Sequence, residues 1–266
     1  MSARSVSGWG APCAGLIFLP ALLAPGAVLL ARVSGSPILL PALATLAVYP
    51  MLAALLVRGR RRSAAVAALL WAASLSASII ACAIRDPGGT GAVVLHGTAY
   101  RDEMFAFIRS GWGTESDPRR FLPQHVLHLV VFCILAACSA GLLGIALGAI
   151  LVGYMSYYVG CLAASGGAPA IAVCLGWPPW AILRVGAFVL LGIALTDPLL
   201  MAVRRRFREA SGPPPGSTAV EPHLPPARRP WRAWYLAAGL LLAADAGLKF
   251  LLAPTWAALL RPCLGP

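Results

Sequence analysis

The sequence predicts an all-α fold, a polytopic integral membrane protein with about seven transmembrane helices. The first observation is composition: 59% of the 266 residues are hydrophobic and only 11% are charged, whereas soluble domains carry about a quarter charged residues. The second is that apolar residues gather in runs of about 20, the length that a helix needs to cross a bilayer. The third is that arginines cluster beside these runs.

Seven apolar runs supply the expected spans. The first three lie at about 11–31, 37–57 and 63–84. The stretch 124–164 would be about 60 Å long as a single helix, so we expect it to turn near Ser139 to Gly141 and to form the fourth and fifth spans. The sixth and seventh are expected at about 178–203 and 231–253. A six-span alternative, in which one run enters the membrane without crossing it, stays open.

The spans divide the chain into three parts. Residues 1–210 are predicted to form a six-span membrane body that includes an outer polar loop at 85–123. Residues 211–230 are rich in proline, which cannot continue a helix, so a cytoplasmic linker in extended conformation is expected. Residues 231–266 are predicted to form the seventh helix and a short outer tail.

The orientation follows from arginine clusters, because short loops rich in Lys and Arg stay in the cytoplasm. Two clusters fall on the same side of a seven-span chain, and they predict a cytoplasmic N-terminus, an outer C-terminus and a cell inner membrane location. The net charge of +12 indicates lipid head groups and no nucleic acid as partner, since the arginines flank apolar runs. The clusters are Arg58, Arg60, Arg61 and Arg62, and then Arg204, Arg205, Arg206, Arg208, Arg228, Arg229 and Arg232.

The outer loop and the start of the fourth span hold most of the candidate site residues. His125 and His128 are three residues apart, so both rings leave one face of a helix. Together with a carboxylate they could act as acid and base, and with His96 they could bind a divalent metal such as zinc. The candidate catalytic set is His125, His128, Asp102, Glu103 and Glu115, and the candidate binding set for an anionic head group is Arg101, Arg109 and Arg184.

A second group of ionisable residues lies within the predicted spans. Asp245 and Lys249, the only lysine, are one turn apart and are expected to form an intramembrane charge pair. Such residues cost at least about 2.5–3.5 kcal/mol each on insertion scales, so they are candidates for function. The alternative is a mutually neutralised pair that only fixes helix order.

These residues favour a membrane-embedded hydrolase or transferase that acts on a lipid, lipid-linked or membrane-anchored substrate at the outer leaflet. A transporter, or a non-enzymatic subunit of a transport or assembly complex that uses Asp245 and Lys249, is the alternative. A scaffold without a site is the third possibility, in which the histidines only bridge backbone and lipid phosphate. The sequence completes no motif of a known family of intramembrane enzymes.

Overall fold

The computed structural model describes residues 11–210 and 231–265, and in these ranges it contains helices and no strand. The elements are α1 (Ala11–Ser34), α2 (Leu39–Val57), α3 (Arg61–Arg85), α4 (Pro87–Val93), α5 (Gly97–Ser110), α6 (Pro118–Cys138), α7 (Leu142–Ala164), α8 (Pro169–Leu175), α9 (Pro179–Ala210), α10 (Trp231–Leu260) and the 3-10 helix η1 (Arg261–Leu264). The expected linker at 211–230 lies outside the described residues.

Seven helical segments are long and apolar enough to cross a membrane, which confirms a multi-span membrane protein. The turn expected at Ser139 to Gly141 separates α6 from α7, and Ala140 and Gly141 both have positive φ there. The short helices α4 and α8 are not among the elements expected from the sequence; α4 lies between two spans, and α8 directly precedes α9 in the sixth apolar segment. Both begin with a proline, whose fixed φ suits the first turn of a helix.

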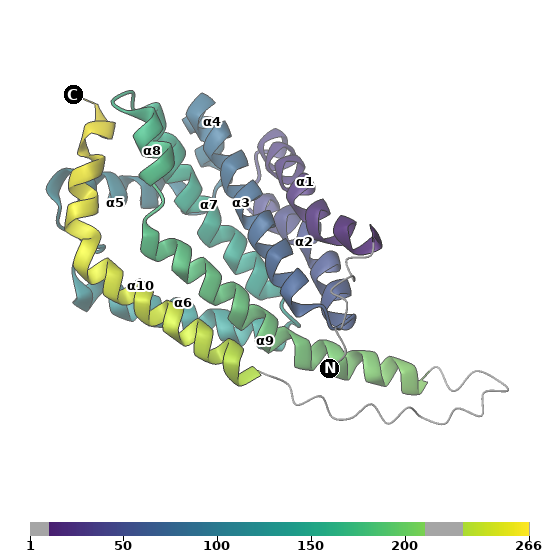
Figure 1. Cartoon of the computed structure of the whole chain (residues 1–266). Helices are drawn as coiled ribbons and strands as arrows, with labels where there is room; N and C mark the ends of the chain where they lie inside the picture. The colour runs from purple at the N-terminus through teal and green to yellow at the C-terminus, as the bar shows by residue number, and fades with distance from the viewer. Residues whose placement is uncertain (1–10, 211–230, 266) are drawn as a thin grey trace, which may run out of the picture.

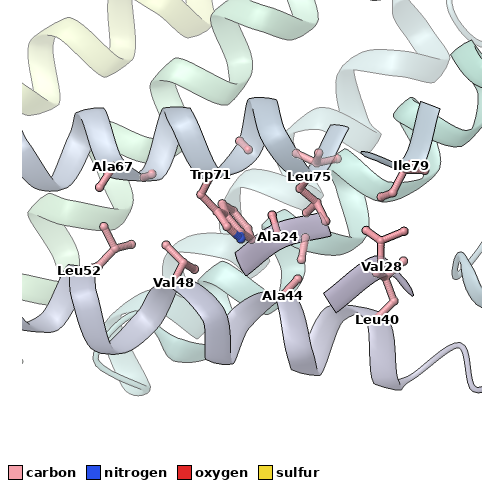
Figure 2. Close-up of a cluster of buried hydrophobic side chains, with 14 of the residues drawn as sticks. Ala24, Val28, Leu40, Ala44, Val48, Leu52, Ala67, Trp71, Leu75 and Ile79 are labelled. Carbon is pink, nitrogen blue, oxygen red and sulfur yellow. The ribbon is translucent and has the colours of Figure 1, made fainter. Parts of the chain in front are cut away.

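The first three helices pack into one apolar core (Figure 2). Alanines at positions 24, 44 and 67 let the backbones approach closely, and the Trp71 ring fills the space between them. Leu75 and Ile79 of α3 are fully buried in the same cluster. At about 25 cal/mol per Å² of buried apolar surface, such side chains stabilise a water-soluble fold; inside lipid, close packing takes over that role.

Helix α7 stands in the middle of the bundle, with α1 to α4 on one side and α6, α9 and α10 on the other (Figure 1). It contacts α2, α3, α5, α6 and α8. Helix α6 contacts mainly α7 and α9, and α10 contacts mainly α9. A cavity lies between these two halves and holds the candidate site.

The run from Tyr100 to Arg109 mixes apolar with charged residues, a pattern that predicts a short amphipathic helix on the membrane surface. Helix α5 forms there, but its apolar face packs against protein. Met104, Phe107 and Ile108 are fully buried in a cluster with α7, α8 and α10. The apolar face of α5 is therefore covered by protein, whereas the sequence pattern predicts that it lies on lipid. The ring of Trp256 on α10, which stacks near Phe107 at 6.4 Å between centroids, supplies the surface that covers it.

The members of the two arginine clusters that the structure describes lie at one end of the bundle; Arg228 and Arg229 are outside the described residues. Arg204 donates to the carbonyl of Val57, at 2.8 Å, so the end of α9 lies beside the end of α2. Arg61 pairs with the buried Asp197 at 3.0 Å, and its guanidinium lies 4.3 Å from the centre of the Trp231 ring. The polar segment at 86–117 connects the last residue of α3 to the first residue of α6, at the end of the bundle opposite to Arg61. The arginines and the candidate site therefore lie at opposite ends of the bundle.

Candidate functional site

A cavity of about 150 Å³ lies between α2, α3, α6, α7 and α9. Its lining is polar at one end only. The other end of the cavity lies near the basic end of the bundle. Leu56 and Thr196 line the cavity there, and Thr196 is next to Asp197, which pairs with Arg61. Between the two extremities the lining is almost entirely apolar. The polar end is lined by Tyr100, Glu115, Gln124, His125, His128, Tyr154 and Arg184.

The start of α6 aims both predicted histidines at this cavity. Asp117 caps the helix by accepting from the backbone N–H of Arg119 at 3.0 Å, and Pro118 fills the first turn. His125 and His128 then follow on the face that lines the cavity. The Phe121 ring, one turn before, lies 5.5 Å from the His125 ring between centroids and limits its movement.

Arg184 and Asp245 form the strongest ion pair at the site. The guanidinium of Arg184 donates twice to the carboxylate, through Nε at 2.9 Å and Nη2 at 2.8 Å. The carboxylate is only 3% exposed. This bidentate geometry is the one that favours arginine over lysine as a partner. It joins α9 to α10, and the arginine also lines the cavity.

Lys249 has a different partner from the one expected. Its ammonium lies 2.8 Å from Glu115 in the loop before α6 and is fully buried. It also lies 4.6 Å from the centre of the Phe121 ring, within the range of a cation–π contact. Asp245 and Lys249 are thus one turn apart and buried, as the sequence indicates, but each is paired with a residue from another element and not with the other.

Several buried nitrogens around the cavity have no hydrogen-bond partner in the part of the chain that the structure describes. They are Nδ1 and Nε2 of His125, Nε1 of Trp71 and Nε1 of Trp177, and all three residues line the cavity. A buried polar group without a partner costs about 1–3 kcal/mol. Three unsatisfied side chains around one cavity therefore indicate a place for polar groups from outside the chain.

Aromatic side chains build the wall at the polar end. The Tyr100 hydroxyl contacts the Met155 sulfur at 2.8 Å, and its ring lies 4.5 Å from that of Tyr154. Burial raises the pKa of the Tyr100 hydroxyl well above its usual range, so the group stays neutral at any physiological pH. Trp256 donates to the carbonyl of Leu175 at 2.8 Å and ties α10 to α8.

Other predicted site residues lie elsewhere. Arg101, Asp102 and Arg109 line a separate hollow of about 480 Å³ between α5 and α7. Arg101 pairs there with Asp102 at 2.7 Å, and that hydrogen bond raises the arginine's pKa. Glu103 is exposed and lines neither cavity. Their catalytic and binding roles stay predictions.

His96 stands apart from the histidines of α6. It is exposed and precedes α5 in a left-handed backbone conformation. Over the described ranges, no three His, Cys, Asp or Glu side chains come close enough together to hold a metal ion. The predicted metal-binding set of His96, His125 and His128 is therefore not brought together in the described structure.

Sequence reasoning missed some members of the site and all of its pairing. Trp71, Trp177 and Tyr154 carry no pattern that marks them as lining residues. A signal did exist for Lys249: a single lysine in an apolar run needs an anionic partner, and Glu115 is one of only 9 acidic residues in the chain. Choosing Glu115 among them requires the fold.

Comparisons with protein-family models, curated proteins and solved structures found no match for this chain. The interpretation of the site therefore depends on its geometry and chemistry.

Proposed function

We propose that this multi-span membrane protein is a hydrolase or transferase that acts on a lipid or membrane-anchored substrate at the polar end of the cavity. The observation that carries the proposal is the placement of His125 and His128 where a long apolar cavity becomes polar. A molecule with a tail and a head group would bring its head to these rings. An imidazole is the side chain most often used to move protons near neutral pH.

The roles of the two histidines follow from that placement. One ring would accept the proton of an attacking water or hydroxyl as its oxygen bonds to the carbonyl carbon or phosphorus of the head group. The proton would then pass to the oxygen that leaves. Arg184 and Glu115 would position the rings and the head group through hydrogen bonds, since each is already fixed by its own ion pair.

We propose further that the polar end faces away from the cytoplasm of a cell inner membrane. The support is that the arginine clusters lie at the other end of the bundle. Cysteines introduced at the exposed positions Ser110 and Arg58, with the seven native cysteines replaced, would test it in intact cells. A membrane-impermeant maleimide should label position 110 and spare position 58, and the reverse pattern would overturn the orientation.

The enzymatic proposal is tested with purified protein in nanodiscs of a bacterial lipid extract, in water enriched with a heavy oxygen isotope. Mass spectrometry should find heavy oxygen in the products of a hydrolase, or an exchanged head group for a transferase. The His125→Ala, His128→Ala variant should form them at least about a hundredfold more slowly. His96→Ala, at an exposed position, is the matched control. Equal rates in wild type and double variant would refute the proposal.

One observation also favours transport as a second candidate. Two ion pairs close to the cavity connect separate elements: Arg184–Asp245 joins α9 to α10, and Lys249–Glu115 joins α10 to a loop. Charges in such places often form relays in pumps and transporters. A carrier would then couple the breaking of these pairs to passage through the cavity.

Single and double neutralisations separate the two candidates. A transporter should lose uptake in vesicles with Glu115→Gln, with Lys249→Met and with both changes together. An enzyme should keep product formation in the double variant better than in either single variant, because removal of both partners leaves no unpaired buried charge.

A further inference from the structure

We infer that the substrate of this site is a single-chain amphiphile with an uncharged polar head group. This inference rests on the proposed function, because it names the class of molecule that the same cavity takes. Three features support it, namely the length of the cavity, its volume and the balance of charge at its polar end.

The length fits a long chain. Along α7 the lining extends from Gly141 to Met155, which is about 21 Å at 1.5 Å per residue. That is most of the hydrocarbon thickness of about 30 Å. A tail that starts at the histidines would therefore cross into the opposite half of the membrane inside the protein.

The volume fits one tail and not two. Over a length of about 21 Å, about 150 Å³ of space for the centres of water-sized groups is a channel of about 7 Å² in section. With the radius of about 1.4 Å of such a group around it, the channel is about as wide as one extended hydrocarbon chain. Diacyl lipids would have to leave their second chain outside.

The charge balance points to an uncharged head group. Arg184 is neutralised by Asp245 and Lys249 by Glu115, so with neutral histidines the polar end has no net charge. Among the described residues that line the cavity, an anionic phosphate would find the Glu115 carboxylate and no cation outside an ion pair to compensate it. Hydroxyl oxygens accept and donate hydrogen bonds and ester oxygens accept them, so both suit the unpartnered nitrogens of His125 and Trp177 without carrying charge.

Gly148 offers a way to fill the cavity without disturbing the helix. It lines the cavity, and a Cβ added there meets no atom within 4 Å. Gly239 on α10 is the matched control, since a Cβ there is equally free but the residue is exposed and does not line the cavity. A leucine at position 148 would occupy the path of the tail, whereas one at position 239 would add to the outer surface.

The test measures binding of radiolabelled monopalmitoylglycerol to the purified full chain in detergent by scintillation proximity. We expect Gly148→Leu to weaken binding at least about tenfold, as overpacking of a filled space does, and Gly239→Leu to leave it unchanged. Equal binding by wild type and Gly148→Leu would overturn the inference. If Gly148→Leu does not fold, the smaller Gly148→Val takes its place.

Competition by other probes tests the class of ligand on the wild-type protein alone. Monoacylglycerols should gain affinity with chain length until the tail spans the lining, which is about 21 Å long, and then level off. Dipalmitoylglycerol and palmitoyl lysophosphatidic acid should each compete at least about tenfold less well than monopalmitoylglycerol. Equal or better competition by dipalmitoylglycerol would refute the inference of a single tail. Equal or better competition by palmitoyl lysophosphatidic acid would refute the inference of an uncharged head group.

Failure of this inference and failure of the proposed function give different results. The His125→Ala, His128→Ala variant should bind monopalmitoylglycerol within about threefold of wild type and yet form no product, because the tail provides most of the buried area. Tail binding without any dependence of product formation on the histidines would leave the inference and remove the enzyme. Histidine-dependent product formation without binding of single-chain probes would support the enzyme and refute the inference about its substrate.

Discussion

The two halves of the bundle bury different kinds of side chain. Around α1, α2 and α3 the core consists of alanine, leucine, valine and isoleucine side chains and the Trp71 ring (Figure 2). Around α9 and α10 it contains Asp245, Lys249 and Arg184, next to a cavity. In the most apolar stretch of α2, half of the residues are buried inside the protein, against 17% in the corresponding stretch of α6. Tight apolar packing serves stability, whereas buried charge and open space cost stability, which is typical of a functional site.

The largest expected effect comes from leaving one charge of the second half alone. Asp245→Leu leaves the Arg184 guanidinium buried without its partner, and we expect a loss of about 3–5 kcal/mol in the free energy of unfolding. Adding Arg184→Met should restore most of it, because no unpaired charge remains. Unfolding in a denaturing detergent, followed by circular dichroism, measures both. A double variant as unstable as the single one would show that the pair itself stabilises the fold.

The first half should respond strongly to lost volume. Leu75 is fully buried among α1 to α3, so Leu75→Ala should cost about 2–5 kcal/mol through the cavity that it creates. Leu151→Ala should lower the free energy of unfolding by less, because Leu151 already borders the existing cavity. The same unfolding assay compares them. An equal cost at both positions would contradict the contrast between a closed and an open half.

Two glycines of α7 sharpen the same comparison at smaller magnitude. A Cβ at Gly160 would lie 2.5 Å from the Cβ of Ala83 and 2.8 Å from the carbonyl of Ile80, so Gly160→Ala should destabilise by about 1–3 kcal/mol. Gly148→Ala faces open space and should be neutral or stabilise by up to about 1 kcal/mol. Melting temperatures in detergent test the opposite signs, and two shifts of the same sign would contradict them.

The smallest effect is expected at the surface. Asp86 accepts from the backbone N–H of Gly89 and pairs with Arg32, and both contacts lower the pKa of its carboxyl. A lowered pKa stabilises the fold at neutral pH, and the gain fades as the pH falls through the usual carboxyl value of about 3.9 and below. Wild type should therefore exceed Asp86→Asn slightly in melting temperature at pH about 7, and the difference should vanish in acid. A difference that grows in acid would contradict the sign.

The sequence was sufficient for the parts of the structure that depend on local composition. The apolar runs predicted the seven long helices, and the small residues at Ser139 to Gly141 predicted the turn between α6 and α7. The spacing of His125 and His128 also predicted a shared helical face, and both line the cavity. Each of these features is set by neighbours a few residues away, which is where periodicity carries information.

The pairing of the charges could not be predicted, because it depends on contacts between distant segments. Lys249 is the nearest cation to Asp245 along the helix, yet Arg184 reaches it from α9 with two hydrogen bonds. Glu115 meets Lys249 only because the loop before α6 folds back toward α10. The apolar face of α5 was likewise assigned to lipid because nothing local to Phe107 indicates that Trp256 would cover it.

The attachment of α10 to the body has a consequence for its alignment. Asp245 must meet Arg184 while Lys249, one turn further on, meets Glu115. A slip of α10 by one turn, about 5.4 Å, would separate both pairs at once and leave four charges without partners in or near hydrocarbon. The last helix is thus held in a single register by charge, where hydrophobic contacts alone would tolerate several.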